Sequence, residues 1–213
     1  MPLIIAHRIN AINGLADVPA HYGVEIDVRH DSRTGRLYLH HDPRTEGQGL
    51  EQCDDLEAYL KHFSHAFIVF NIKEAGIEKK CIELAAAHRI PPEHYFLLDV
   101  EFPFLYAATR GTRPDVQTSS IAVRYSEAEP LEMALTQKGL VDWVWIDTNT
   151  TLPLDEKSAP LLMKNFKTCL VSPDRWRPDK AKEEIPAYRK RMEALGFRLD
   201  AVMTGLEHAR LWE

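Results

Sequence analysis

The segment Val24–Arg29 has the sequence Val-Glu-Ile-Asp-Val-Arg, and it decides the fold class. Apolar and charged side chains alternate along it with a period of two, as in a β-strand whose two faces meet different surroundings. The segment Phe67–Lys73, Phe-Ile-Val-Phe-Asn-Ile-Lys, is a second such strand, and its polar residues lie at the carboxyl end. Both segments therefore predict strands with one face toward a helix layer and polar side chains on the other.

Apolar, β-branched segments recur along the chain and alternate with amphipathic stretches. Apolar residues at helical spacing occur in Leu56–Phe63, Ile77–His88 and Ile185–Leu195. Because neighbouring parallel strands need crossover connections, this alternation predicts an α/β fold with a parallel sheet. The eight predicted strands are Leu3–Ala6, Val24–Val28, Phe67–Ile72, Tyr95–Asp99, Ser120–Val123, Trp143–Ile146, Thr168–Val171 and Ala201–Met203.

Eight strands are the number that closes a (β/α)8 TIM barrel, and we expect one such domain over residues 1–213. The fold typically has about 250 residues, so this barrel must be compact, with economical connections. The segment Ser172–Glu184, rich in proline and charge, is expected to be a loop after the seventh strand. An open doubly wound sheet is the alternative, but its glycine-rich phosphate turn is missing from the first strand–helix junction.

The composition excludes several classes of protein. The chain has 26 basic and 32 acidic residues and a net charge of −6, which provides no field for holding a polyanion, so no nucleic-acid partner is expected. No apolar run approaches the ~20 residues that span a bilayer, and Met1–His7 lacks the features of a secretion signal. Cys53, Cys81 and Cys169 are odd in number and widely spaced, as expected of reduced thiols in a cytoplasmic protein.

Glu25 and Asp27 are two residues apart, so both carboxylates face the same side of their strand. Burying such a pair is costly unless cations compensate it. Hard divalent ions prefer oxygen ligands, and the side-chain oxygen of Asn71 on the third predicted strand would add one more. The pattern predicts one weakly held Mg²⁺ or Ca²⁺ at these three residues.

Basic side chains offer the alternative compensation for the same carboxylates. Arg8 follows the first predicted strand, Arg29 ends the second and Lys73 ends the third. These side chains could neutralise the carboxylates without a metal, and their charges would also serve an anionic substrate. We therefore expect Arg8, Arg29 and Lys73 to bind the substrate.

Two histidines are placed where a strand would deliver them to the mouth of the barrel. His7 ends the first predicted strand, and His41 follows a predicted β-turn at Ser32–Gly35. His40 and His41 cannot both point inward on an extended chain, and the sequence leaves open which of them does. With an unperturbed pKa of about 6.5, a histidine can donate or accept a proton near neutrality. Trp145 is expected to form an apolar wall for the substrate.

The order of these polar residues resembles the signature of the glycerophosphodiester phosphodiesterase family. The motifs are Ala6-His7-Arg8 with Asn10, then Glu25-x-Asp27, His41-Asp42 and Asn71-x-Lys73. That family belongs to the phosphatidylinositol-phospholipase-C-like phosphodiesterases, which are built on a (β/α)8 barrel. The four motifs lie within the first 73 residues, and the rest of the chain is similar only in its alternation of strands and helices.

The resemblance implies a role for each matched residue. His7 and His41 would be the acid–base pair, and the basic residues of the first and last motifs would hold the phosphate. Glu25 and Asp27 would bind the metal. The implied activity is metal-assisted hydrolysis of a small or lipid-derived, glycerophosphodiester-like substrate. The chemistry agrees, because cleaving a phosphodiester needs one group to take a proton and another to give one, while cations stabilise the non-bridging oxygens.

Three residues depart from the family pattern and indicate a divergent member. Ile9 replaces the glycine after His-Arg, which is expected to tilt the turn or narrow the site. Asn71 replaces a glutamate ligand, so the metal affinity should fall. Gly205 stands where an aspartate usually follows the threonine. The alternative to an enzyme is a catalytically degenerate barrel that binds a phosphorylated ligand or a partner protein, but the retained histidines and carboxylates favour catalysis.

Overall fold

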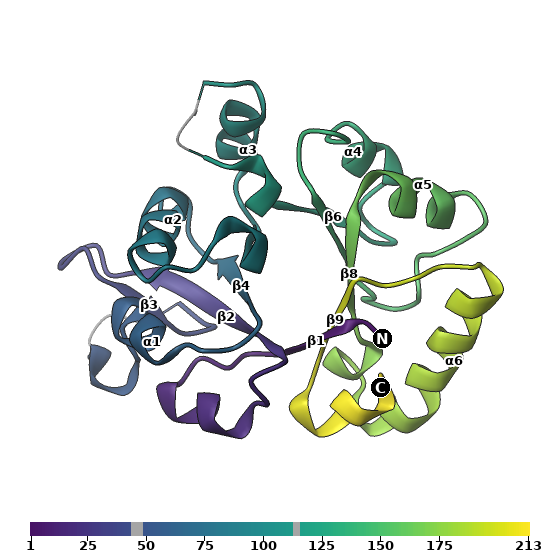
Figure 1. Cartoon of the computed structure of the whole chain (residues 1–213), viewed down its shortest axis with the longest axis horizontal. Helices are drawn as coiled ribbons and strands as arrows, with labels where there is room; N and C mark the ends of the chain where they lie inside the picture. Colours follow the sequence, from purple (N-terminus) through teal and green to yellow (C-terminus); the bar gives the residue numbers. More distant parts are fainter. Residues whose placement is uncertain (44–48, 113–115) are drawn as a thin grey trace.

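The computed structural model describes residues 1–43, 49–112 and 116–213. Within these residues, eight parallel strands form a barrel that is covered by helices (Figure 1), as predicted for a TIM barrel. The strands are neighbours in the order β5-β4-β2-β1-β9-β8-β7-β6. The strand bounds are β1 Leu3–Ala6, β2 Gly23–His30, β4 Phe67–Ile72, β5 Tyr95–Leu98, β6 Ala122–Tyr125, β7 Trp143–Ile146, β8 Lys167–Val171 and β9 Ala201–Thr204.

The barrel closes between β5 and β6, and this seam is its weakest contact. Elsewhere neighbouring strands share continuous register; β2, for example, pairs with β4 from Gly23 to Val28. In the part of the chain that the structure describes, β5 and β6 are joined by one isolated parallel bridge, between Leu97 and Ile121. The eight strands therefore enclose a nearly closed barrel.

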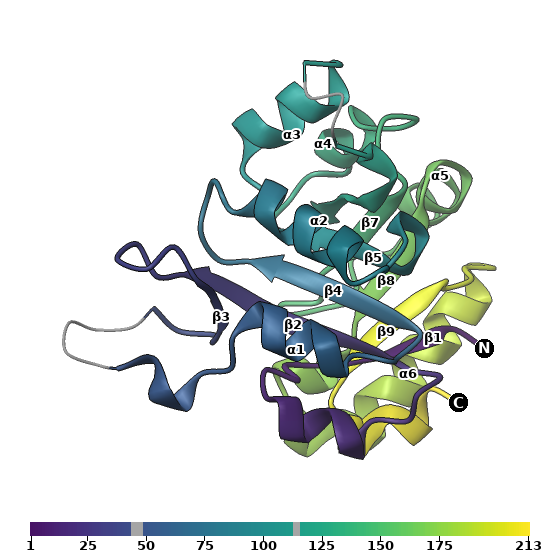
Figure 2. The same ribbon diagram turned by 60° about the vertical axis from the view of Figure 1, so that its left-hand side comes forward.

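A ninth strand, β3 (Leu37–Leu39), pairs antiparallel with the end of β2 and lies outside the barrel order. Figure 2 shows this hairpin extending beyond the barrel wall. The sequence does not predict β3, because three residues are too few to show a period. Gly35, at the predicted turn, has a φ of 72°, a conformation that glycine adopts without strain. The hairpin leads directly into His40 and His41, so it carries the second histidine motif toward the mouth.

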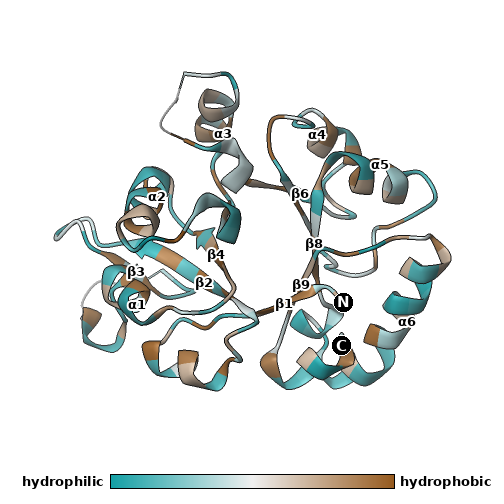
Figure 3. Cartoon of the chain, in the orientation of Figure 1, coloured by the Kyte–Doolittle hydropathy of each residue, from teal (hydrophilic) through white to brown (hydrophobic). Residues whose placement is uncertain are grey.

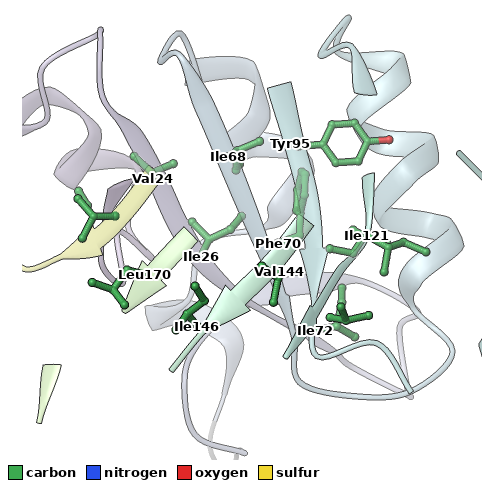
Figure 4. Close-up of a cluster of buried hydrophobic side chains, with 14 of the residues drawn as sticks. Val24, Ile26, Ile68, Phe70, Ile72, Tyr95, Ile121, Val144, Ile146 and Leu170 are labelled. Atoms are coloured by element: carbon green, nitrogen blue, oxygen red, sulfur yellow. The ribbon is translucent and has the colours of Figure 1, made fainter. Parts of the chain in front are cut away.

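Alternate side chains of the strands enter two separate apolar clusters. Val24, Ile26, Ile68 and Phe70 belong to the outer cluster, between the strands and the helices (Figure 4), as the alternation predicts. The opposite faces fill the barrel, so polar groups gather at its ends rather than along its axis. The inner cluster consists of Ile5, Phe67, Val69, Phe96, Leu98, Ala122, Trp143, Trp145, Cys169, Val171, Ala201 and Met203.

The helices are short, as the length of the chain requires. In the part of the chain between β1 and β2, the connection contains only a 3₁₀ helix, Ile12–Asp17. Of the α-helices, α6 shows both hydrophilic and hydrophobic segments in Figure 3, as expected of a helix that covers a barrel. The helix bounds are α1 Leu56–His62, α2 Glu78–Ala87, α3 Phe102–Thr109, α4 Leu131–Leu135, α5 Ser158–Asn165 and α6 Ala181–Ala194.

The bounds of five of the eight predicted strands differ from the observed ones, and the expected loop after β8 is partly helical. The expected loop Ser172–Glu184 contains two 3₁₀ turns and the beginning of α6. Ala181 and Ile185 are both buried and four residues apart, which is the spacing of one side of a helix. β6 starts at Ala122 rather than Ser120, which belongs to a 3₁₀ turn. None of the three cysteines, which all lie in the described ranges, is joined to another by a disulfide bond. Among the described residues, every helix is too short or too polar to cross a bilayer.

Candidate active site

A cavity of about 170 Å³ lies at the carboxyl ends of the barrel strands. It brings together all of the predicted site residues except Arg29, from the first, second and third parallel strands and the β3 loop. Trp145 lines it from the barrel interior, where its side chain is buried and its indole N–H has no hydrogen-bond partner among the described residues. The polar lining consists of His7, Arg8, Glu25, Asp27, His41, Asn71, Lys73, Arg124, Asp147, Asn149 and Arg175.

Glu25 is completely buried at the floor of this cavity, and N–H groups occupy both of its oxygens. Its Oε1 accepts a hydrogen bond from Nδ2 of Asn71 at 2.8 Å, and its Oε2 accepts one from the backbone N–H of Arg8 at 2.9 Å. Burial and the neighbouring charge of Asp27 raise the pKa of Glu25 to about 7. Arg8 donates this bond from a left-handed conformation, with a φ of 55°, which marks a backbone held under strain at a functional site.

Asp27 forms the ionic centre of the site. Its Oδ1 lies 3.0 Å from Nζ of Lys73, and its Oδ2 accepts a hydrogen bond from Nδ2 of Asn10 at 2.8 Å. Asn10 also accepts a bond from the backbone N–H of Asp27 at 2.8 Å, so it clamps this residue on both sides. Burial by itself would raise the pKa of Asp27, but the bond from Asn10 and the charge of Lys73 lower it. Asp27 is therefore an ionised partner for the lysine.

The donor set does not fit the predicted Mg²⁺ or Ca²⁺. All four oxygens of Glu25 and Asp27 are engaged by N–H groups or by the ammonium of Lys73. Asn71 turns its amide N–H, rather than its oxygen, toward Glu25, where a metal site would need a third oxygen ligand. Its Oδ1 is buried without a hydrogen-bond partner in the described part of the chain. In this arrangement, basic and amide groups compensate the carboxylates, as in the alternative that the sequence left open.

His7 is held at the end of β1, where its backbone N–H donates to the carbonyl of Thr204 at 3.0 Å. Burial, followed by the positive charges of Arg175 and Arg8, lowers the pKa of His7 to about 3. His7 is therefore neutral at physiological pH and can accept a proton. His7 and His41 line the same cavity.

His41, rather than His40, faces the cavity. Nδ1 of His41 lies 2.8 Å from Oδ1 of Asp42, which orients the ring. The same contact lowers the pKa of Asp42. His40 is exposed, and its Nδ1 lies 2.8 Å from the carbonyl oxygen of Asp42. The choice that the sequence left open is thus made by the loop after β3.

The predicted contact of Arg29 with substrate is wrong, because its guanidinium is used elsewhere. Nη2 and Nε donate to the carbonyl of His41 at 2.7 and 3.2 Å, and Nε also to that of His40 at 3.2 Å. Nη1 pairs with Glu74 at 3.0 Å. Arg29 is buried beneath the loop and holds the backbone of the histidine motif. Arg29 lies on the same face of β2 as Glu25 and Asp27, as the alternation predicts, but it is not part of the cavity lining.

Two other expectations change in the structure. Ile9 does not narrow the site, because its side chain packs against the outer apolar cluster and is not part of the cavity lining. Gly205 lacks the aspartate of the family pattern, and a carboxylate contacts this position from Asp174 in the loop after β8. Its two oxygens accept hydrogen bonds from Oγ1 of Thr204 at 2.9 Å and from the backbone N–H of Gly205 at 2.8 Å.

Arg175 and Trp176 line the cavity, and sequence reasoning did not find them. They follow β8 in the segment Ser172–Glu184, which was expected to be a loop. The signal was their position just after a strand end, but that position alone does not distinguish a residue facing the cavity from its neighbours.

A larger cavity, of about 510 Å³, lies outside the barrel between α3 and α4. It shares Arg124 with the smaller one, and its lining is mainly apolar. Because the titratable groups gather in the smaller cavity, that cavity is the candidate active site.

The fold is that of the glycerophosphodiester phosphodiesterases, which confirms the resemblance at the level of architecture. A phosphodiesterase of Oleispira antarctica, solved with its product sn-glycerol-3-phosphate, matches with a TM-score of 0.66 and 16% identity, covering 100% of this chain and 96% of that one. A glycerophosphoryl diester phosphodiesterase of Parabacteroides distasonis has a TM-score of 0.65 and 14% identity, covering 99% and 86%. An Agrobacterium tumefaciens protein assigned the same activity has a TM-score of 0.67 and 14% identity, covering 100% and 97%. No protein-family model and no curated protein sequence matches.

Proposed function

We propose that the chain is a phosphoric diester hydrolase that cleaves a small or lipid-derived phosphodiester with His7 and His41 as its acid–base pair. The observation that supports this proposal is the meeting of both imidazoles with Arg8 and Lys73 in one cavity at the barrel mouth. The fold neighbours, one of them solved with a glycerol phosphate product, agree with it.

His7 acts as the base. Its low pKa leaves the imidazole neutral, and a bound phosphodiester would raise that pKa, because the negative charge opposes the arginines that depress it. His7 takes a proton from the attacking water molecule as the water oxygen forms a bond to phosphorus. The P–O bond to the leaving alcohol then breaks.

His41 acts as the acid and gives its proton to the oxygen of the leaving alcohol. The carboxylate of Asp42 stabilises the protonated imidazole before this transfer. Arg8 and Lys73 face the non-bridging oxygens, where negative charge develops in the transition state. The contacts already made by Glu25 and Asp27 keep these side chains in place, and the proton transfers need no step at a metal.

The test is turnover of a panel of glycerophosphodiesters, lysophospholipids, inositol phosphodiesters and nucleoside-diphosphate-linked alcohols. His7→Ala and His41→Ala should each lower turnover about 10²–10⁴-fold, with little change in KM. His40→Ala is the matched control, because this neighbouring imidazole is exposed and outside the cavity. Activity that survives the loss of both histidines would contradict the mechanism. Cleavage of no diester would favour the barrel that only binds a phosphorylated ligand or a partner.

A further inference from the structure

Arg175 lines the cavity from the loop after β8. It ends the 3₁₀ turn Pro173–Arg175 and is half-buried. Its guanidinium carbon lies 4.7 Å from the ring centroid of Trp176, so the aromatic face fixes one side of the group. Among the described residues, no carboxylate lies within ion-pair distance of it. An arginine held in a cavity with free N–H donors is ready to bind an anion.

The segment that carries Arg175 is rigidly anchored. The buried carboxylate of Asp174 bonds to Thr204 and Gly205 on β9 and the turn after it. Oγ of the buried Ser172 accepts a hydrogen bond from Nε1 of Trp212 at 2.9 Å. The position of Arg175 is therefore set by the fold before any ligand binds, which lowers the entropic cost of using it.

A second arginine faces the same space. Arg8 lies across the cavity, with its Nε buried and 3.9 Å from the nearest oxygen of Asp27, too far for a hydrogen bond. Arg8 and Arg175 line one cavity, so their guanidinium groups repel each other, and burial followed by the charge of Arg8 lowers the pKa of Arg175. Lys73 and Arg124 form closer ion pairs, with Asp27 at 3.0 Å and with Asp147 at 2.7 Å, than the 3.9 Å contact of Arg8 with Asp27. An anion between Arg8 and Arg175 would relieve this repulsion.

The opposite side of the cavity has lost a negative charge. Asn71 stands where the resembling family has a glutamate, and its N–H bonds to Glu25. A divalent cation there would have one carboxylate fewer to hold it and would lie in the field of an additional arginine, so its binding is disfavoured twice.

We propose that Arg8 and Arg175 clamp the phosphate between them, and that Arg175 supplies the electrostatic stabilisation that a divalent ion would otherwise provide, so that the site binds its anion without metal. The proposal rests on the proposed function for the identity of the anion as a phosphodiester. Arg175 is then a substrate-binding residue of this chain that the family motifs do not contain.

Calorimetry with inorganic phosphate and with sn-glycerol 3-phosphate, in the presence of a chelator, tests the clamp. The wild-type protein should bind both, and Arg175→Met should weaken binding about 10–100-fold, the value of a charge-assisted contact. Arg175→Lys should recover part of the affinity, since lysine keeps the positive charge but cannot donate the two parallel hydrogen bonds of a guanidinium group. Arg33→Met is the control, because Arg33 lies on the exposed hairpin and outside the cavity. Binding that requires added Mg²⁺ or Ca²⁺, or that is unchanged in Arg175→Met, would overturn the proposal.

A second measurement tests whether Arg175 takes the place of a divalent ion. The double variant Asn71→Glu, Arg175→Met restores a carboxylate and removes the competing cation, so it should bind Ca²⁺ in a calorimetric titration. Wild-type protein should bind neither Mg²⁺ nor Ca²⁺ up to millimolar concentrations, and binding of either ion by the wild type would refute metal independence.

The proposed function and the proposed clamp can fail separately. Diester cleavage only with a divalent ion would refute the clamp alone, whereas metal-free phosphate binding without any cleavage would refute the proposed function alone.

Discussion

Arg124 closes the barrel at its weakest seam, and its replacement by methionine should loosen that seam first. Its Nε and Nη2 donate to the two oxygens of Asp99, beyond the end of β5, at 2.5 and 3.1 Å. Its Nη1 donates to Asp147, after β7, at 2.7 Å. Because the backbones of β5 and β6 share one isolated bridge in the described chain, this side chain is the main polar link across the seam.

The expected loss follows from how deeply these groups are buried. The side chain of Asp147 is 8% exposed, while those of Arg124 and Asp99 are 32% and 27% exposed. Breaking a fully buried pair costs about 3–5 kcal/mol, and an exposed pair contributes about 0–1 kcal/mol. With one carboxylate left buried and one partly hydrated, Arg124→Met should lower the free energy of unfolding by about 2–3 kcal/mol.

Urea denaturation measures this loss, and a double-mutant cycle with Asp99→Asn isolates the seam contact, with an expected coupling of about 1–2 kcal/mol. Arg124→Met should increase the rate of amide hydrogen exchange at Leu97 and Ile121, and it should increase it less at the centre of β2. Lys157→Met is the control, since its pair with Glu132 is 69% exposed on both sides and should change the stability by less than about 0.5 kcal/mol. A loss for Arg124→Met as small as that of the control would refute the role of the ion pair.

Two further predictions concern stability. Asp174→Ala leaves Thr204 Oγ1 and the backbone N–H of Gly205 without an acceptor, so urea denaturation should show that the free energy of unfolding falls by about 2–4 kcal/mol. Asp174→Asn keeps one acceptor and should lose about half as much, and equal stability of both variants and wild type would contradict this anchoring role. His7 has a pKa of about 3 in the fold, against 6.5 when unfolded, so the unfolded chain binds its proton first and stability falls as the pH drops from 6.5 toward 3. Between pH 6.5 and 4.5 this contribution changes by about 2 kcal/mol, and denaturation curves of His7→Asn should lack it. The raised pKa of Glu25 acts in the opposite direction in both proteins, and an unchanged difference between wild type and variant across this range would exclude the low pKa of His7.

Residues whose structure depends on local periodicity were predictable from the sequence. β1, β4 and β7 have their predicted bounds, and Val24 and Phe70 lie on the predicted outer face. A period of two assigns each side chain to one side of a strand regardless of what lies there. The gathering of His7, Glu25 and Asn71 follows from the same rule, because parallel barrel strands end at one mouth, whereas His41 is brought there by the antiparallel strand β3.

Residues whose role depends on a distant partner were not predictable in this way. Arg29 lies on the predicted face but is taken by the carbonyls of the histidine loop, and Arg175 appeared to belong to an ordinary loop. Asp174 contacts the position at which the family pattern has an aspartate, 31 residues later in the chain, and only a through-space contact can reveal this.

The sequence by itself determined the barrel and the end of it at which His7, Glu25 and Asp27 gather, because the alternation of side chains is a local property of the strands. The tertiary structure alone decided how the buried carboxylates are compensated. Whether Glu25 and Asp27 meet a metal or N–H groups depends on the distances and orientations of Asn71, Lys73 and Arg8, which come from separate strands and loops. Charge compensation acts through space over a few ångströms in a medium of low dielectric, and no pattern along the chain encodes those distances.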